Sequence, residues 1–386
     1  MTRAGRPSDP VADRLRIYGN LRSAHLERLR TMAPATMWFT GTRADLDESL
    51  VDPANPPVAM TARSALTTLA RRPFSVIELN EPAMVPSWKF LVPAVAVVRL
   101  RDLLTRRHTV LTSYCIENFD PVAQVVHRWH PPSWLARWVT LVVVRLLVRA
   151  SDRLAFGTEG SRDLYRELVG ERVLSRRSRL FEALPARCDC GDRDVGVAAS
   201  TEDGATGLSA ASEVLFLGSF VDRKGIVPTM AAWDVVHERR PELRLRVIGA
   251  GSRRDEVERW ARDHPEVTLT IDPPRREIHR TLRERPVLVL LSQPVGAWRE
   301  QVGLPIVEAL AHGGEVVTTS ETGLAGWLVD HGHDVVAPDA PPGEVADRIL
   351  AAVERRGTRD GSLADLPAED QRLAADEWMM SGQLGA

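Results

Sequence analysis

Residues 298–314 read WREQVGLPIVEALAHGG and come five residues after VLVLLS (287–292), a run typical of a buried strand. Pro305 suits the first turn of a helix, because the N–H that it lacks would find no intrahelical acceptor there, and Gly313 suits the C-terminal end. The stretch therefore predicts a helix that begins near Gly303, at the carboxyl end of a parallel strand. Doubly wound α/β sheets bind ligands at such places, where free N–H groups and the positive end of the helix dipole face outward.

The predicted helix start, at Val302, Gly303 and Leu304, is a natural seat for a diphosphate. Glu300 precedes the turn and Glu308 lies one turn into the helix. A carboxylate accepts hydrogen bonds from two hydroxyls at once, so this pair suits the vicinal hydroxyls of sugars. Taken alone, two glutamates around a helix start more often form a solvated face and a partner for the dipole.

Lysine occurs only twice in this arginine-rich chain, at Lys89 and Lys224. Lys224 lies in GSFVDRKG (residues 218–225), between the predicted strand EVLFLGS and a predicted helix. A cation there opposes the helix dipole unless an anion offsets it. We therefore predict that Lys224 contacts a phosphate, with Arg223 as a second candidate, and we assign no role to Lys89.

A third stretch, VIGAGSRRDEVERW (residues 247–260), predicts a strand, a glycine turn and a helix. Gly249 and Gly251 would let a ligand approach the backbone closely. A G-x-G pattern is weak evidence alone, and its position after the Lys224 strand is what makes it a nucleotide-binding candidate.

In order and spacing, these three stretches resemble the C-terminal half of family 4 of the retaining glycosyltransferases, over residues 213–356. The resemblance implies the GT-B fold, an α/β architecture of two Rossmann-like domains whose parallel sheets face an interdomain cleft. It also implies that Glu300 contacts the donor sugar, Glu308 the ribose and Lys224 the diphosphate. Where the family usually has a second phosphate-binding arginine, this chain has Ser219.

The first half resembles the family more loosely. LNEPAM (from Leu79) and YCIENF (from Tyr114) are similar to a subgroup with EP and EN motifs at strand ends. Glu81, Glu117 and Asn118 are thereby predicted to contact the acceptor. The alternative is that they are turn residues that satisfy the local backbone.

Short runs of Val, Ile, Leu and Phe alternate with helical patterns along the whole chain, which predicts parallel sheets covered by helices. A chain of 386 residues favours two domains. We predict a first domain at 1–190, a small, polar linker at 191–212, a nucleotide-sugar domain at 213–356 and a tail at 357–386 that is a candidate to cross back onto the first domain. Strands are expected to begin near residues 14, 35, 73, 108, 153, 178, 213, 243, 267, 287, 315 and 334.

The composition indicates which binding partners and which cellular compartment to expect. A net charge of −2 gives no reason to expect nucleic acid. Three cysteines, and an N-terminus without an apolar signal core, favour the cytoplasm. Cys188 and Cys190 resemble half of a metal site, but no second Cys or His pair follows at suitable spacing, so we predict no metal and read the two thiols as incidental.

Residues 134–150 (WLARWVTLVVVRLLVRA) form the most membrane-like stretch, but three arginines and its length exclude a span. Leu135, Trp138, Val142 and Leu146 share one helical face. The pattern fits a helix packed on a sheet, which we favour, or a surface helix in peripheral contact with the inner face of a membrane.

Together these patterns and the resemblance predict a metal-independent glycosyltransferase without a bound cofactor, and the resemblance implies that it retains the anomeric configuration. Its donor would be a UDP-, GDP- or similar nucleotide sugar, and its acceptor a glycan, a lipid-linked sugar or a small molecule, in glycan, glycolipid or secondary-metabolite biosynthesis. One alternative is a catalytically impaired relative that serves as a binding partner, motivated by Ser219 and by Gly326-Trp327, where the family usually has Pro-Glu. A nicotinamide-dependent oxidoreductase is disfavoured, since no G-x-G-x-x-G turn follows the first strand.

Overall fold

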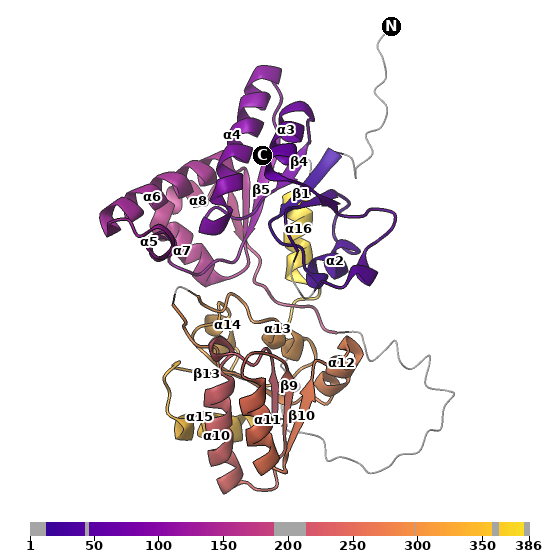
Figure 1. Cartoon of the computed structure of the whole chain (residues 1–386), viewed down its shortest axis with the longest axis vertical. Helices are drawn as coiled ribbons and strands as arrows, with labels where there is room; N and C mark the ends of the chain where they lie inside the picture. The colour runs from indigo at the N-terminus through magenta and orange to yellow at the C-terminus, as the bar shows by residue number, and fades with distance from the viewer. Residues whose placement is uncertain (1–12, 43–45, 189–213, 297, 357–362, 382–386) are drawn as a thin grey trace. The chain divides into compact units, whose positions relative to one another are not determined.

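The computed structural model describes residues 13–42, 46–188, 214–296, 298–356 and 363–381 (Figure 1). The chain divides into two compact units. Unit 1 combines Met1–Glu182 with Arg372–Ala386, and unit 2 is Ala183–Gln371. The division thus falls after Glu182, whereas the predicted linker at 191–212 lies outside the described residues.

Unit 1 contains a parallel sheet of seven strands in the order β3-β2-β1-β4-β5-β6-β7. Six of these strands begin within a few residues of the predicted positions. β3 was missed because it has two residues, both exposed, and so carries no hydrophobic pattern. The strands are β1 (Arg14–Tyr18), β2 (Thr36–Phe39), β3 (Val58–Ala59), β4 (Val76–Glu78), β5 (Val110–Cys115), β6 (Arg153–Phe156) and β7 (Ser178–Leu180). The helices are α2 (Ser23–Leu29), α3 (Ala62–Arg71), α4 (Trp88–Thr105), α5 (Pro121–Trp129), α6 (Ser133–Ala150), α7 (Glu159–Val169) and α8 (Glu171–Leu174), with short 3-10 turns at Glu48–Leu50 and Val85–Ser87.

Unit 2 contains a parallel sheet of six strands in the order β10-β9-β8-β11-β12-β13, all of them predicted. The strands are β8 (Val214–Leu217), β9 (Leu245–Gly249), β10 (Val267–Ile271), β11 (Val287–Leu290), β12 (Val316–Thr319) and β13 (Asp334–Val336). The helices are α10 (Ile226–Arg239), α11 (Arg254–Asp263), α12 (Arg275–Arg283), α13 (Leu304–Ala311), α14 (Ala325–Asp330) and α15 (Pro342–Arg355), and a 3-10 turn, η3 (Asp222–Lys224), precedes α10.

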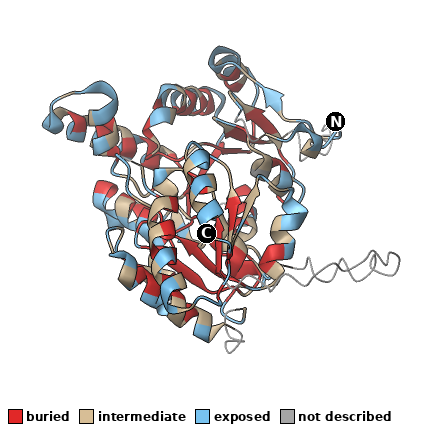
Figure 2. Ribbon diagram, turned by 60° about the horizontal axis from the view of Figure 1, so that its bottom comes forward, coloured by how far each residue is buried: buried red, intermediate tan, exposed pale blue. Residues whose placement is uncertain are grey.

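Each sheet reverses its strand order once. In unit 1 the reversal lies between β1 and β4, and in unit 2 it lies between β8 and β11. Such a switch point leaves a crevice at the carboxyl ends of the two strands, because the following loops run in opposite directions. In both units the central strands and the inner faces of the helices are buried, whereas the edge strands β3, β7 and β10 are partly or fully exposed (Figure 2).

The C-terminal helix α16 (Gln371–Met380) is held on unit 1 by a buried ionic cluster. Asp376 accepts two hydrogen bonds from Arg16 of β1, at 2.7 and 2.8 Å, and Glu78 of β4 accepts one from Arg372 at 2.8 Å. Arg16 and Asp376 are fully buried. Removing one partner of such a pair typically costs about 3–5 kcal/mol because the other charge is left buried and uncompensated.

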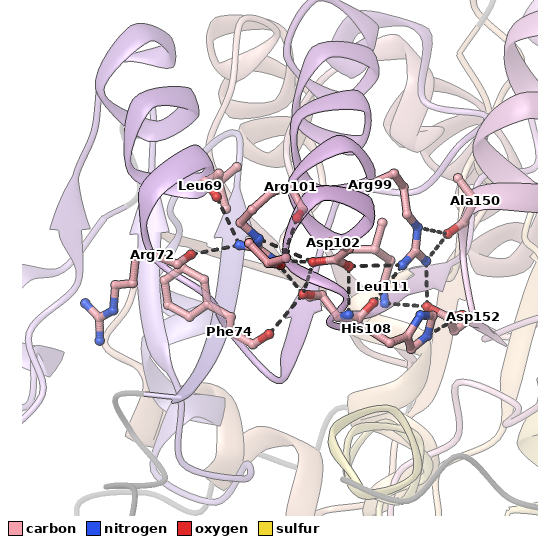
Figure 3. A network of polar contacts seen from close by, with 12 residues as sticks. Leu69, Arg72, Phe74, Arg99, Arg101, Asp102, His108, Leu111, Ala150 and Asp152 are labelled. Atoms are coloured by element: carbon pink, nitrogen blue, oxygen red, sulfur yellow. Dashed lines mark hydrogen bonds and ion pairs between the residues drawn. The ribbon is translucent and has the colours of Figure 1, made fainter.

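A second network joins elements at the opposite, amino-terminal ends of the unit 1 strands (Figure 3). Arg101 of α4 donates to the Leu69 and Arg72 carbonyls, and Asp102 accepts from the Thr109 amide at 2.8 Å. Arg99 ion-pairs with Asp152, just before β6. These groups connect α3, α4, β5 and β6 away from the switch point, which indicates a structural role.

Helix α6 packs with a different face from the predicted one. Its buried residues are Ala136, Thr140, Val144, Leu147 and Val148. Trp138 and Leu146, which we expected against the sheet, are about 60% exposed. The expectation was wrong because α6 has two apolar faces, and the face with the smaller residues, which packs beside α4, α5 and α7, is the buried one.

Candidate functional site

Lys224 and Glu300 meet at the unit 2 switch point, since Lys224 follows β8 and Glu300 follows β11. The ammonium group ion-pairs with Glu300 Oε2, and Ser292 Oγ donates to the same oxygen at 3.1 Å. Both charged side chains are largely buried. Two residues predicted independently from sequence therefore form one charged centre.

Gly225 explains how Lys224 reaches β11. Its φ is +72°, and a Cβ at this position would lie 1.8 Å from the carbonyl oxygen of Leu291. Only glycine lets η3 pack this closely against the end of β11. Lys224 is the last residue of η3, and α10 begins two residues later.

The predicted helix start at 302–304 is confirmed. Gly303 precedes α13 with a φ of +79°, and Pro305 lies in the first turn. Val302 is partly buried and Leu304 is exposed. Thr322 Oγ1 donates to the Val302 carbonyl at 2.8 Å and so holds the turn. The described residues supply no side-chain cap for α13, which leaves its N-terminus suited to an anion.

Trp298 adds an aromatic platform that we did not predict. The Arg223 guanidinium carbon lies 4.5 Å from its ring centroid, and Lys224 Nζ lies 5.7 Å from it. A cation over an indole face is attracted by the ring quadrupole. Arg223, Lys224 and Trp298 thus lie together. In the sequence, only the position of Trp298, two residues before Glu300, could have indicated that it belongs to this group.

Glu308 lies on α13 and accepts a hydrogen bond of 2.7 Å from Arg275 of α12. We did not predict a role for Arg275, because no pattern in the neighbouring sequence singles it out. The ribose role of Glu308 stays a prediction.

The glycines of the third stretch have a packing role. A Cβ on Gly249 would lie 1.9 Å from the Gly218 carbonyl oxygen, and one on Gly251 would lie 2.5 Å from that of Phe220. On the side where a Cβ would point, the close approach is therefore made by the protein's own backbone, and the nucleotide-binding role of these two glycines stays a prediction. Ser219 is exposed at the end of β8.

In unit 1, Glu81 is buried and faces the backbone. Its carboxylate accepts from the Ile116 and Glu117 amides at 3.1–3.2 Å, and Tyr165 Oη lies 3.3 Å away. Burial, followed by the neighbouring Glu117 carboxylate, raises the pKa of Glu81 to about 8. These contacts match the turn alternative for Glu81. Glu117 is buried and Asn118 partly buried, and the acceptor role of all three stays a prediction.

A pocket of about 280 Å³ lies at the unit 1 switch point. Gly19 and Asn20 follow β1, Asn80 follows β4, and Lys89 comes from the start of α4. Sequence reasoning assigned no role to Lys89, and its ten-residue separation from the end of β4 hid its proximity to that strand end.

Cys188 lies beside His279 and His312. Spacing rules could not find this group, because its members come from three distant parts of the chain. Cys190 lies outside the described residues. Among the helices of the described chain, none combines the length and apolarity that a membrane span requires.

Comparison with known proteins gives the fold. Residues 211–355 match the family model described as Glycosyl transferases group 1. HepE (Alr3699) of Anabaena, solved with UDP and glucose, is 14% identical, with 96% of this chain and 95% of that chain covered and a TM-score of 0.58. WaaG, a glycosyltransferase involved in lipopolysaccharide biosynthesis, is 10% identical (95% and 99% covered, TM-score 0.56), and trehalose 6-phosphate synthase from Burkholderia multivorans is 11% identical (95% and 95%, TM-score 0.61).

No curated protein sequence matches the chain significantly. The structural likeness, together with the two parallel sheets, shows that the fold is GT-B. The predicted fold is thus confirmed, while identities this low carry no activity across.

Proposed function

We propose that this protein is a glycosyltransferase that moves a sugar from a nucleoside diphosphate sugar to an acceptor hydroxyl, with retention of anomeric configuration. The carrying observation is the Lys224–Glu300 pair at the β8/β11 switch point of a domain that matches the glycosyltransferase family model. The process would be the biosynthesis of a glycan, a glycolipid or a secondary metabolite.

In this proposal the donor diphosphate binds Lys224 and thereby breaks the ion pair between Lys224 and Glu300. The acceptor hydroxyl oxygen replaces the diphosphate oxygen on the anomeric carbon, the diphosphate leaves with the bonding electrons, and the hydroxyl proton passes to the departing diphosphate oxygen. Lys224, Arg223 and the α13 N-terminus meet the charge that develops, which is the task of preorganised groups in a dry site. Released from its ion pair, Glu300 is then available to accept hydrogen bonds from sugar hydroxyls.

This set of cations makes a metal at the diphosphate unnecessary, so we propose metal-independent transfer. Chelator-treated enzyme should not require added Mg²⁺ for turnover. An absolute, magnesium-reversible requirement would contradict this part of the proposal.

We propose that the nucleoside lies along α13, with Glu308 at the ribose and Arg275 orienting the carboxylate. UDP is the first nucleotide to test. The HepE structures contain UDP or UDP-glucose, and a trehalose-6-phosphate structure contains UDP-2-fluoro glucose. GDP sugars come next.

We place the acceptor in unit 1, in the pocket at the β1/β4 switch point. The amides of Asn20 and Asn80 and the hydroxyl of Ser87 offer both donors and acceptors, which neutral sugar hydroxyls need. Lys89 adds one cation, so an acceptor with a phosphate or carboxylate would fit better than a wholly neutral one.

Helix α6 supports a peripheral membrane location at the inner face, with the protein in the cytoplasm. Trp134, Trp138 and Leu146 are each at least 60% exposed. Arg137, Arg145 and Arg149 are exposed on the same helix, which has no acidic residue. Aromatic and basic side chains on one exposed surface suit an anionic lipid interface.

Sedimentation with phosphatidylcholine vesicles, with and without phosphatidylglycerol, tests this location. Binding should require the anionic lipid and should weaken when Trp134 and Trp138 are both changed to Ser. Equal binding by the variant would remove α6 from the interface.

A thermal-shift screen of nucleotides and nucleotide sugars tests the function first. A ligand at 100 times its dissociation constant stabilises the folded state by about 2.7 kcal/mol. Mass spectrometry of reactions with the best donor then detects transfer or hydrolysis. The alternative of a catalytically impaired binding partner, motivated by exposed Ser219, is excluded by any donor turnover.

A further inference from the structure

Three side chains that commonly bind metals come together in unit 2, in the order Cys188, His279 of α12, and His312 just after α13. His279 Nδ1 and His312 Nε2 are 3.4 Å apart, and Cys188 Sγ is 3.9 Å from His279 Nδ1. All three ligand atoms lie within 4.8 Å of one another. Two nitrogens bound at about 2.1 Å to one tetrahedral ion lie about 3.4 Å apart, which is the spacing observed.

The ring of His312 is set in the tautomer that a metal needs. Its Nδ1 lies 2.7 Å from the Glu308 carbonyl oxygen, which can only accept, so the proton belongs on Nδ1. Nε2 then presents its lone pair toward His279. Metal-bound histidines are typically oriented by such a bond to a carbonyl.

Cys188 is held in place by its backbone. Its amide donates to the carbonyl of Ala311, the last residue of α13, at 2.8 Å. This bond holds Cys188 beside Ala311, the residue before His312, and so keeps the thiol near the His312 ring.

The same two helices are joined twice. Arg275 and His279 lie one turn apart on α12, and Glu308 and His312 are four residues apart along and just beyond α13. On one turn of the two helices Arg275 forms an ion pair with Glu308, and on the next turn His279 lies beside His312. An ion between the two histidines would fix the spacing of the helices that hold Glu308.

We propose that Cys188, His279 and His312 bind a zinc-class divalent cation, with a fourth position for water, and that this ion clamps α12 to α13. The thiol loses its proton on binding, and no oxidation state changes. The site lies at the end of α13 opposite to its N-terminus, so the ion is structural and is compatible with metal-independent transfer. The site itself does not depend on the proposed function, and only a coupling to Glu308 and the donor would.

Cobalt titration of the chelator-treated, full-length protein tests the site. Tetrahedral Co²⁺ bound to a thiolate gives charge-transfer and d–d absorption bands, and Zn²⁺ should displace it at one ion per chain. Cys188→Ser, His279→Gln and His312→Gln should each weaken binding about 10- to 100-fold or more, as is typical when a metal site loses a supporting group. His264→Gln, just after α11, is the matched control and should bind normally.

A wild-type protein without the cobalt spectrum, or with an affinity equal to that of Cys188→Ser, would overturn the site. Because three separate variants are used, a fold failure in one leaves the other two decisive. Circular dichroism of each apo variant identifies such a failure.

Hydrogen exchange tests the clamp. Zn²⁺ should slow amide exchange in α12 and α13 of the wild type but not of Cys188→Ser. Zinc binding with unchanged exchange in both helices would overturn the clamp. If none of the screened nucleotides and nucleotide sugars binds with or without zinc, the proposed function fails, while the cobalt and exchange results still decide the site.

Discussion

The two switch points share a topology and differ in chemistry. Each holds one of the only two lysines in the chain. In unit 2, Lys224 is ion-paired with Glu300 and lies near the ring of Trp298. In unit 1, Lys89 lines a pocket together with the amides of Asn20 and Asn80.

This difference indicates which ligand each unit suits. A charged centre beside a helix N-terminus stabilises an anionic leaving group, whereas amides pair with neutral hydroxyls in either direction. In the proposed function, the two sheets would bind their ligands at equivalent positions, and the side chains after each strand would select which ligand binds. The predictions below separate the two sites.

The largest effect is expected for Lys224→Ala. Removing a preorganised cation from developing charge should lower turnover by a factor of about 100–1000, or about 3–4 kcal/mol. Steady-state kinetics with a demonstrated donor measures it, and Arg262→Ala, an exposed change on α11, is the control. A comparable loss in Arg223→Ala would mean that the arginine stands in for the one absent at Ser219. Near-normal turnover in Lys224→Ala would show that the phosphates lie elsewhere.

Glu308→Ala should act on donor affinity. Losing a charged hydrogen bond to the ribose costs about 1.5–3 kcal/mol, which raises the donor Kd about 10- to 150-fold. Titration calorimetry with the nucleotide measures the change. Arg275→Ala, which only orients the carboxylate, should cost less, and an unchanged Kd for Glu308→Ala would refute the ribose contact.

Lys89→Ala should have a smaller effect, confined to the acceptor. An exposed ion pair contributes about 0.2–1 kcal/mol, so the KM for an anionic acceptor should rise up to about fivefold. The donor Kd should not change, and Lys89→Arg should retain most of the affinity. A weakened donor Kd would break the division of labour between the units.

Glu81→Gln should alter the pH dependence of stability. The folded protein keeps a proton on Glu81 up to about pH 8, whereas the unfolded chain releases it near the ordinary pKa of 4.5. Between these values the folded state binds more protons, so this group makes stability fall as pH rises, by at most about 1.4 kcal/mol per pH unit. Urea denaturation at pH 5, 6.5 and 8 should show a shallower fall for the variant. Identical slopes would mean that Glu81 is ionised in the folded protein.

The sequence predicted unit 2 better than unit 1 for a physical reason. Its site is assembled from local patterns, since Gly225, Gly303 and Pro305 each mark a backbone turn that places a neighbouring functional group. Glu300, Glu308 and Lys224 lie within a few residues of these turns in the sequence. Twelve strands were likewise predictable, because their buried runs are nearly continuous.

Groups that depend on contacts between distant segments could not be predicted. Arg275, Lys89 and the Cys188 cluster reach their partners through packing that leaves no local signal. Gly249 and Gly251 have a second reason to be glycine that their pattern did not reveal, since a Cβ at either position would meet the backbone of the neighbouring strand end. The exposed face of α6 was misassigned because periodicity alone cannot tell which of two apolar faces is buried.

The most direct test of the central claim is calorimetric titration of UDP, or of the best nucleotide from the screen, into wild type, Lys224→Ala and Lys89→Ala. If the β8/β11 switch point binds the diphosphate, Lys224→Ala should raise the Kd about 10-fold or more, as expected for a lost charged contact. Lys89→Ala should match the wild type. A Kd unchanged in Lys224→Ala but raised in Lys89→Ala would contradict the account.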